Sequence, residues 1–179
     1  MIKENNAAVS PVVGVMLMLV VTILIAAVVS AFAGGMGGST KDKAPQVTLR
    51  GEFSLSNGIT IEHTGGDTVA TRDAKLLIRG SPDTGTDYIT TTVNKTSISD
   101  ANGKVWMKKS GSAELTSFGA GDIIYIKPPY HTCGFLQPPR TTAKSCWDQG
   151  DNIGKHLIVE LSDNSGNRIF AKTQIAIVP

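Results

Sequence analysis

One stretch of this chain restricts its fold more than any other, because Ala7–Ala33 contains no charged side chain. The whole interval between Glu4 and Lys41 lacks Asp, Glu, Lys and Arg. The 23 residues of Pro11–Ala33 would form a helix of about 35 Å at about 1.5 Å per residue. That length crosses a hydrocarbon layer of about 30 Å. The sequence therefore predicts an N-terminal apolar helix that is long enough to span a membrane.

The ends of this helix are marked by residues that typically start and stop helices. Ser10 can act as an N-cap, and Pro11 would occupy the first helical position, where its missing N–H costs nothing. Beyond Ala33 the chain becomes rich in glycine, which weakens a helix. We expect this glycine-rich stretch to act as a hinge, formed by Gly34, Gly35, Gly37 and Gly38.

Two explanations of the apolar segment follow from general rules. A cleaved secretory signal would fit Ala31–Ala33, which has the A-x-A form that precedes such a cut. Against it, the apolar run exceeds the usual core of about 7–15 residues. A permanent membrane anchor is the second explanation. Small residues recur at helical spacing on two faces, which would let another helix approach closely. These residues are Ala26, Ser30 and Gly34 on one face and Ala27, Ala31 and Gly35 on the other.

A third explanation comes from resemblance. Residues 8–18 read AVSPVVGVMLM and residues 26–29 read AAVV. This segment resembles the N-terminal segment of archaeal type IV pilins over roughly residues 1–36, and the likeness extends loosely to residues 59–67, ITIEHTGGD. It implies that a prepilin peptidase cuts between Ala7 and Ala8 and leaves the apolar helix on the mature protein. Bacterial type IV pilins carry a glutamate at the fifth mature position, where this chain has Val12, so the resemblance is to the archaeal branch.

The resemblance also implies an organisation and a set of partners. It divides the chain into a leader (1–7), a helix (8–34), a linker (35–45) and a head (46–179). The helix would first anchor a membrane-inserted precursor and then form the core of a helical filament of identical subunits, an extracellular adhesion pilus. An assembly ATPase and a membrane platform protein would act transiently. The helix positions expected to pack against neighbours are Ser10, Pro11, Gly14, Ala26, Ala27, Ser30 and Ala31.

The head shows period-two alternation rather than a helical repeat. Ile59 and Ile61 alternate with polar residues after an Asn57-Gly58 turn, and Leu157, Val159 and Leu161 precede a final hairpin. The strands expected from this pattern are 46–50, 53–55, 59–63, 74–79, 88–93, 104–108, 122–127, 157–161 and 169–177. Short strands at this spacing favour a two-sheet, immunoglobulin-like sandwich. The predicted fold class is therefore α+β, a long hydrophobic helix followed by an all-β sandwich head.

Residues 128–147 form the least regular part of the head and read PPYHTCGFLQPPRTTAKSCW. Cys133 and Cys146 are the only cysteines, and in an exported domain such a pair most simply forms one disulfide. Two buried free thiols are the alternative. The segment would serve as a stapled loop for adhesion or subunit contact, or simply as a rigid connection between strands.

The remaining motifs are few. Asn94-Lys95-Thr96 is the one N-x-[ST] sequon, so Asn94 is a candidate glycosylation site. His63, His131 and His156 lack metal-motif spacing, and we expect no metal, cofactor or catalytic residue. A net charge of +2 does not favour nucleic acid as a partner. We therefore expect a structural pilin subunit, with a monomeric, single-pass membrane-anchored binding module as the alternative and a secreted β-sandwich cut after Ala33 as a third possibility.

Overall fold

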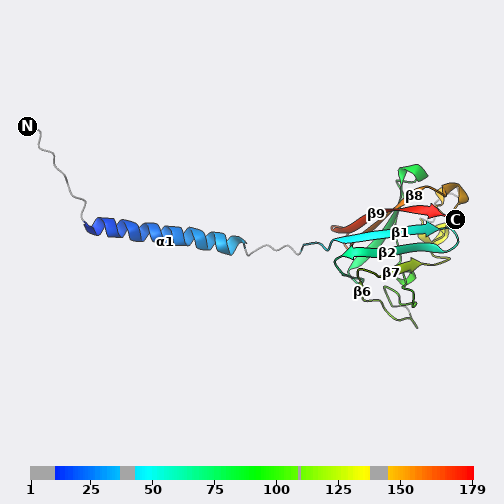
Figure 1. Cartoon of the computed structure of the whole chain (residues 1–179), viewed down its shortest axis with the longest axis horizontal. Coiled ribbons are helices and arrows are strands. Elements are labelled where there is room, and N and C mark those ends of the chain that lie inside the picture. Colours follow the sequence, from blue (N-terminus) through cyan, green and yellow to red (C-terminus); the bar gives the residue numbers. More distant parts are fainter. Residues whose placement is uncertain (1–10, 37–42, 109, 138–144) are drawn as a thin grey trace, which may run out of the picture. The chain divides into compact units, whose positions relative to one another are not determined.

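The computed structural model describes residues 11–36, 43–108, 110–137 and 145–179. The chain divides into two units, Met1–Lys43 and Ala44–Pro179, and we describe each by itself (Figure 1). The first unit contains α1, which runs over Pro11–Met36. The second unit is the head, and it holds all the β-strands. The predicted order of a long apolar helix followed by a β-rich head is confirmed.

Helix α1 is 26 residues long, which corresponds to about 39 Å. It continues through Gly34 and Gly35 to Met36, two residues beyond the expected end at residue 34. A glycine costs a helix only about 1 kcal/mol, so two glycines weaken the last turn without ending it. Gly37 and Gly38 lie outside the described residues, and so do Ala7, Ala8 and Ser10.

Seven strands of the head form one sheet in the order β5-β4-β8-β9-β1-β2-β7. Neighbouring strands are antiparallel except β1 and β9, which pair in parallel. The strands are β1 (Val47–Ser54), β2 (Gly58–Gly66), β4 (Ala74–Gly80), β5 (Thr90–Thr92), β7 (Ile123–Ile126), β8 (His156–Asp163) and β9 (Ile169–Val178). A separate two-stranded sheet pairs β3 (Val69–Ala70) with β6 (Ser117–Phe118).

The predicted two-sheet, immunoglobulin-like sandwich is not confirmed. The parallel contact joins Glu52–Ser54 of β1 to Ala176–Val178 of β9. It therefore places the N-terminal and C-terminal hairpins in one continuous sheet, which curls around its buried face (Figure 1). Among the described residues, the only other sheet is the short β3–β6 pair. Period-two alternation shows that each strand has one covered face, but it does not show what covers that face.

One face of the large sheet forms the core of the head. The apolar side chains buried on this face come from every strand of the sheet except β5: Leu49, Phe53, Ile59, Ile61, Leu76, Ile78, Ile124, Ile126, Leu157, Val159, Leu161, Ile175 and Ile177. Segments between the strands cover this face with Trp106, Trp147, Ile98 and Leu136, all at most 2% exposed. Large side chains from connecting segments thus fill much of the space that a second large sheet would fill in a sandwich.

Most of the individual strand predictions are confirmed, but the two strands expected at 46–50 and 53–55 are one continuous strand, β1, and two other predictions are wrong. The final hairpin is formed by β8 and β9 as predicted. Residues 104–108 contain no strand and contribute only isolated bridges at Val105. Residues 88–93 contain only the three residues of β5. In both segments threonine and valine favour extended backbone, but a full strand also needs a neighbouring ladder, and the sequence does not show where one exists.

The register gives the head two distinguishable ends. At the linker-side end, Val47 lies opposite Gly66 and Ala74 lies opposite Asp163. At the far end, Ser54 lies beside Val178 in β9, and Gly80 lies opposite Leu157. Strand β7 also finishes at the far end, where Ile126 pairs with Ile59. The long connection from β7 to β8, which includes both cysteines, therefore begins and finishes at the end of the head opposite the linker.

Candidate functional site: an apolar helix and a stapled far end

Helix α1 presents apolar side chains on every side. Its large residues between Val12 and Phe32 are 43–72% exposed, and the helix has no acidic residue in its first turn and no basic residue in its last. The segment Val12–Phe32 meets the length and composition of a membrane-crossing helix, with a mean hydropathy of 3.1. A helix that is apolar all round requires lipid or other helices around it.

The small residues singled out in the sequence lie on the surface of this helix. Ala26, Ala27, Ser30 and Ala31 are exposed, and a Cβ added at Gly14 would meet no atom within 4 Å. The Thr22 hydroxyl donates to the carbonyl of Leu19 at 2.9 Å, so its polar group is satisfied within the helix.

The stapled segment at the far end is organised by a disulfide. Cys133 and Cys146 are bonded, with their Cα atoms 5.3 Å apart, which confirms the predicted pairing. Cys133 opens the one-turn helix α2 (Cys133–Leu136), and its N–H donates to Oδ2 of Asp148 at 3.2 Å. Both sulfurs are consumed in the bond, so the neighbouring Asp148 carboxylate does not complete a metal site with them.

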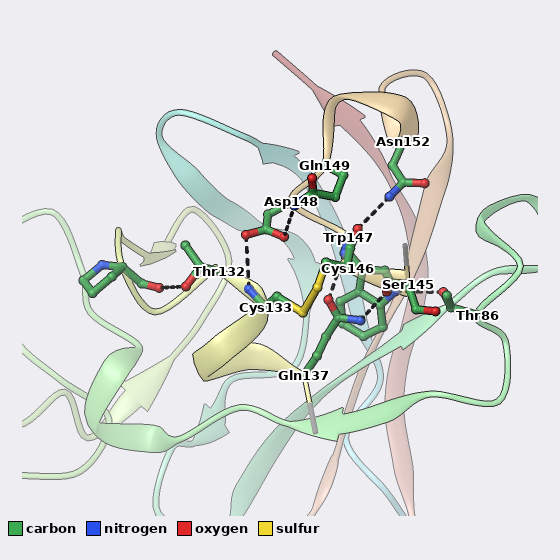
Figure 2. The surroundings of a disulfide bond; sticks show 11 residues. Thr86, Thr132, Cys133, Gln137, Ser145, Cys146, Trp147, Asp148, Gln149 and Asn152 are labelled. Atoms are coloured by element: carbon green, nitrogen blue, oxygen red, sulfur yellow. Dashed lines mark hydrogen bonds between the residues drawn. A yellow bond between two sulfur atoms is a disulfide. The ribbon is translucent and has the colours of Figure 1, made fainter. Parts of the chain in front are cut away.

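Hydrogen bonds join the two described parts of this segment, residues 133–137 and 145–147 (Figure 2). Gln137 bridges them, because its Nε2 donates to the carbonyl of Ser145 at 2.7 Å and its Oε1 accepts from the N–H of Trp147 at 2.8 Å. The indole Nε1 of Trp147 donates to Oγ1 of Thr86 at 2.8 Å. Gln137, Thr86 and Trp147 are all buried, so these bonds are formed away from water and each would be costly to lose.

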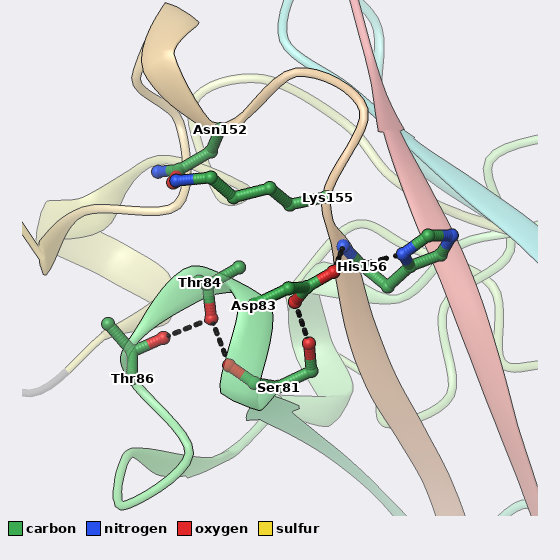
Figure 3. A network of polar contacts seen from close by, with 7 residues as sticks. All are labelled: Ser81, Asp83, Thr84, Thr86, Asn152, Lys155 and His156. Carbon is green, nitrogen blue, oxygen red and sulfur yellow. Dashed lines mark hydrogen bonds and ion pairs between the residues drawn. The ribbon is translucent and has the colours of Figure 1, made fainter.

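A second network closes the same end of the head (Figure 3). Asp83 lies in the 3-10 turn η1 (Pro82–Thr84), and its Oδ2 accepts from the N–H and the Nδ1 of His156, each at 3.0 Å. The hydroxyl of Ser81 also donates to this carboxylate. Burial acts to raise the pKa of Asp83, but the hydrogen bonds from Ser81 and His156 outweigh it and leave the pKa below its ordinary value.

Four large apolar side chains are exposed on the loops of the far end. Tyr130 and Phe135 are 41% and 62% exposed, and Tyr88 and Ile153 are 74% and 46% exposed. The rings of Tyr130 and Phe135 meet edge to face, with centroids 5.5 Å apart, a favoured aromatic geometry. A well-formed aromatic pair that faces solvent offers contact area to a partner.

Two of the three histidines are structural. His63 is fully buried in β2, and its Nε2 donates to the carbonyl of Asp67 at 3.1 Å. His131 is buried within residues 128–147, and its Nε2 donates to the carbonyl of Leu55 at 3.1 Å. Neither histidine is among the described residues that cluster at metal-ligand distances.

Sequence reasoning found the cysteine pair but missed the residues that hold it. Thr86 lies in a different loop, 61 positions from Trp147, and no local pattern connects the two. Tyr88 was assigned to a strand that begins two residues later, at Thr90, so its exposure on a loop was not anticipated. The proline and aromatic content of residues 128–147 was the one signal that pointed to this region.

Comparison with known proteins finds a family similarity in the N-terminal part of the chain. Residues 7–49 match the family described as archaeal type IV pilin, N-terminal. The chain is also 33% identical over 79 residues to an uncharacterized protein of Archaeoglobus fulgidus. That match covers 44% of this chain and 56% of the relative, so it spans little more than half of the relative's length.

Proposed function

We propose that the chain is a structural subunit of an extracellular archaeal pilus, because residues 7–49 match the family described as archaeal type IV pilin, N-terminal. The family match carries this proposal, because it covers the two residues of the proposed cut, Ala7 and Ala8, together with the whole of α1 and the start of β1. The uniformly apolar surface of α1 supports it, since a filament core surrounds each helix with other helices. The role is structural and requires no catalytic residue and no cofactor.

Burial of α1 in a filament would remove much apolar surface from water. Fifteen large apolar residues of the helix are exposed, from Val12 to Phe32. At about 1.5–3 kcal/mol for each fully buried side chain, the gross gain relative to water is roughly 20–45 kcal/mol. Ordering costs on association are about 4–15 kcal/mol, so escape of a subunit into water would be negligible. Lipid solvates the same helix equally well, and transfer from membrane to filament therefore needs an energy source.

The proposed maturation begins at the leader. A prepilin peptidase cuts between Ala7 and Ala8 while α1 holds the precursor in the membrane with the head outside. An assembly ATPase and a membrane platform protein then move the helix into the growing fibre. Ser10, Pro11 and the small residues of α1 allow close packing between helices. Gly34 and Gly35 belong to α1, so Gly37 and Gly38, which follow the helix in the sequence, are the proposed hinge that lets the head adopt the angle the lattice requires.

The far end of the head is the proposed adhesive surface. The aromatic pair of Tyr130 and Phe135 lies at the end opposite the linker and is exposed. The disulfide and the bonds of Gln137 tie Cys133–Gln137, which includes Phe135, to Ser145–Trp147, and this restraint lowers the entropy cost of binding. Filaments carrying Tyr130→Ala and Phe135→Ala together should assemble normally but attach fewer cells to a surface than filaments carrying Ile169→Ala, which changes an exposed apolar residue at the linker-side end of the head.

Leader cleavage offers a genetic test of the proposal. Replacing Ala7 by arginine places a bulky charge beside the proposed cut, and we expect filaments to disappear from electron micrographs while the precursor stays in the membrane. Ala101→Arg is the matched control, because Ala101 is exposed in the head and filaments should persist. Normal fibres in the Ala7→Arg strain would contradict the proposal and favour a membrane-anchored monomeric module.

A further inference from the structure

The sequon at the end of β5 forms a closed turn on the surface of the head. Asn94 is the N-cap of the 3-10 turn η2 (Lys95–Ser97) and is exposed. Its Oδ1 accepts from the N–H of Thr96 at 3.0 Å and from the Thr96 hydroxyl at 2.9 Å. The N–H and hydroxyl of Ser97 both donate to the Asn94 carbonyl, at 2.9 and 2.7 Å. The first and third residues of the sequon therefore lie side by side.

Lys95 fastens this turn to the rest of the head. Its Nζ donates to the carbonyls of Thr71 and Arg72, at 3.2 and 2.7 Å, and to Oδ1 of Asn164 at 2.9 Å. Partial burial lowers the pKa of Lys95, and the charge of Asp73 offsets this in part. All three ammonium hydrogens are used, and the lysine side chain is drawn inward against two neighbouring turns. The asparagine before it is left facing solvent.

Asn94 is exposed, and its side-chain nitrogen Nδ2 is not held by the turn. Both of the donors that reach this side chain use Oδ1, and within the described part of the chain Nδ2 has no hydrogen-bond partner. We propose that Asn94 of the folded head is the acceptor of an N-linked glycan, presented by the turn that Lys95 fastens. The donor is a lipid-phosphate-linked oligosaccharide. Nδ2 bonds to the anomeric carbon, the bond from that carbon to the phosphate oxygen breaks with its electron pair, and one Nδ2 proton passes to a base of the transferase.

The position of Asn94 gives the glycan a physical role. Strand β5 is the edge strand of the seven-stranded sheet and has only three residues. Asn94 follows it two positions after Thr92, beside the edge that β5 leaves unpaired. Exposed strand edges recruit strands from other molecules, and pilus heads are crowded at high local concentration. A glycan here covers the edge with a hydrated polymer and blocks pairing between heads.

Mass spectrometry of filaments taken from native cells tests this proposal. We expect the mature subunit to exceed its sequence mass by whole sugar residues, all located on the peptide that contains Asn94. Asn94→Gln and Thr96→Val should both return the protein to its sequence mass. Thr96→Ser should keep the glycan, because serine preserves the hydroxyl of the sequon. Asn102→Gln, at another exposed turn asparagine, is the matched control and should also keep it.

The four variants separate modification from folding. Thr96→Val changes only the hydroxyl for a methyl of similar size, so loss of the glycan with intact filaments identifies Asn94 as the acceptor. A bare Asn94 in native filaments, or an added mass that persists in Asn94→Gln, would overturn the proposal. The inference rests on export of the head, as proposed above, but filaments with bare Asn94 would leave the pilin proposal intact.

Discussion

The Cys133–Cys146 disulfide permits a quantitative prediction, because its sequence separation of 13 residues sets the entropy that it removes from the unfolded chain. Loop-closure entropy for that separation is about 10 cal/mol/K, or about 3 kcal/mol at 25 °C. The head has 179 − 43 = 136 residues, and unfolding entropy is about 2.1 cal/mol/K per residue. Replacing both cysteines by alanine should therefore lower the melting temperature by about 10 °C.

Near-ultraviolet circular dichroism of the full chain in detergent is a suitable assay, because Trp106 and Trp147 are each 1% exposed and report on packing of the head. Reduction of the unmodified protein should reproduce the shift, whereas reductant should leave the cysteine-free variant unchanged. An unaltered melting temperature in that variant would refute the reasoning. It would mean that the disulfide removes far less entropy from the unfolded chain than loop closure predicts.

Three further predictions concern the core, the acid response and the helix. Thr86→Val should lower the free energy of unfolding by about 1–3 kcal/mol, measured by urea titration, because the buried Trp147 Nε1 loses its acceptor; an unchanged midpoint would show that the bond contributes nothing. The lowered pKa of Asp83 means that its bonds stabilise the head above the ordinary pKa of 3.8 and that this contribution is lost as the pH falls through the lower folded pKa. Asp83→Asn should therefore flatten the acid limb of a stability–pH profile, and an identical limb would count against the His156–Asp83 contact. Ala27→Leu should abolish fibres without reducing membrane insertion, and normal fibres would exclude close helix packing at that position.

The sequence was most informative where a single residue type or spacing decides the structure. The uncharged, almost wholly apolar run of Pro11–Ala33 is long enough to cross a membrane as a helix, and α1 follows from it directly. The hairpin of β8 and β9 follows from clean alternation around a turn at Asp163–Gly166. In such segments local geometry and burial agree, so local reasoning is sufficient.

The sequence was least informative where partners far apart in the chain decide the structure. The three residue pairs between β1 and β9 join the first and last strands of the head, and no local pattern encodes that contact. The same is true of Thr86 and Trp147, whose hydrogen bond fixes the stapled segment. Alternation predicted which face of each strand is covered. It did not predict that Trp106 and Trp147 cover that face, because this depends on the path by which the long connections between strands fold back over the sheet. The sandwich prediction failed at this point.

The mass of the N-terminal peptide from native protein tests the central claim most directly. The pilin account predicts a mature chain in filaments that starts at Ala8, with the whole of α1 retained. A chain that keeps Met1 would contradict the account and indicate a permanent membrane anchor, and a chain that starts at Gly34 would indicate a secreted head.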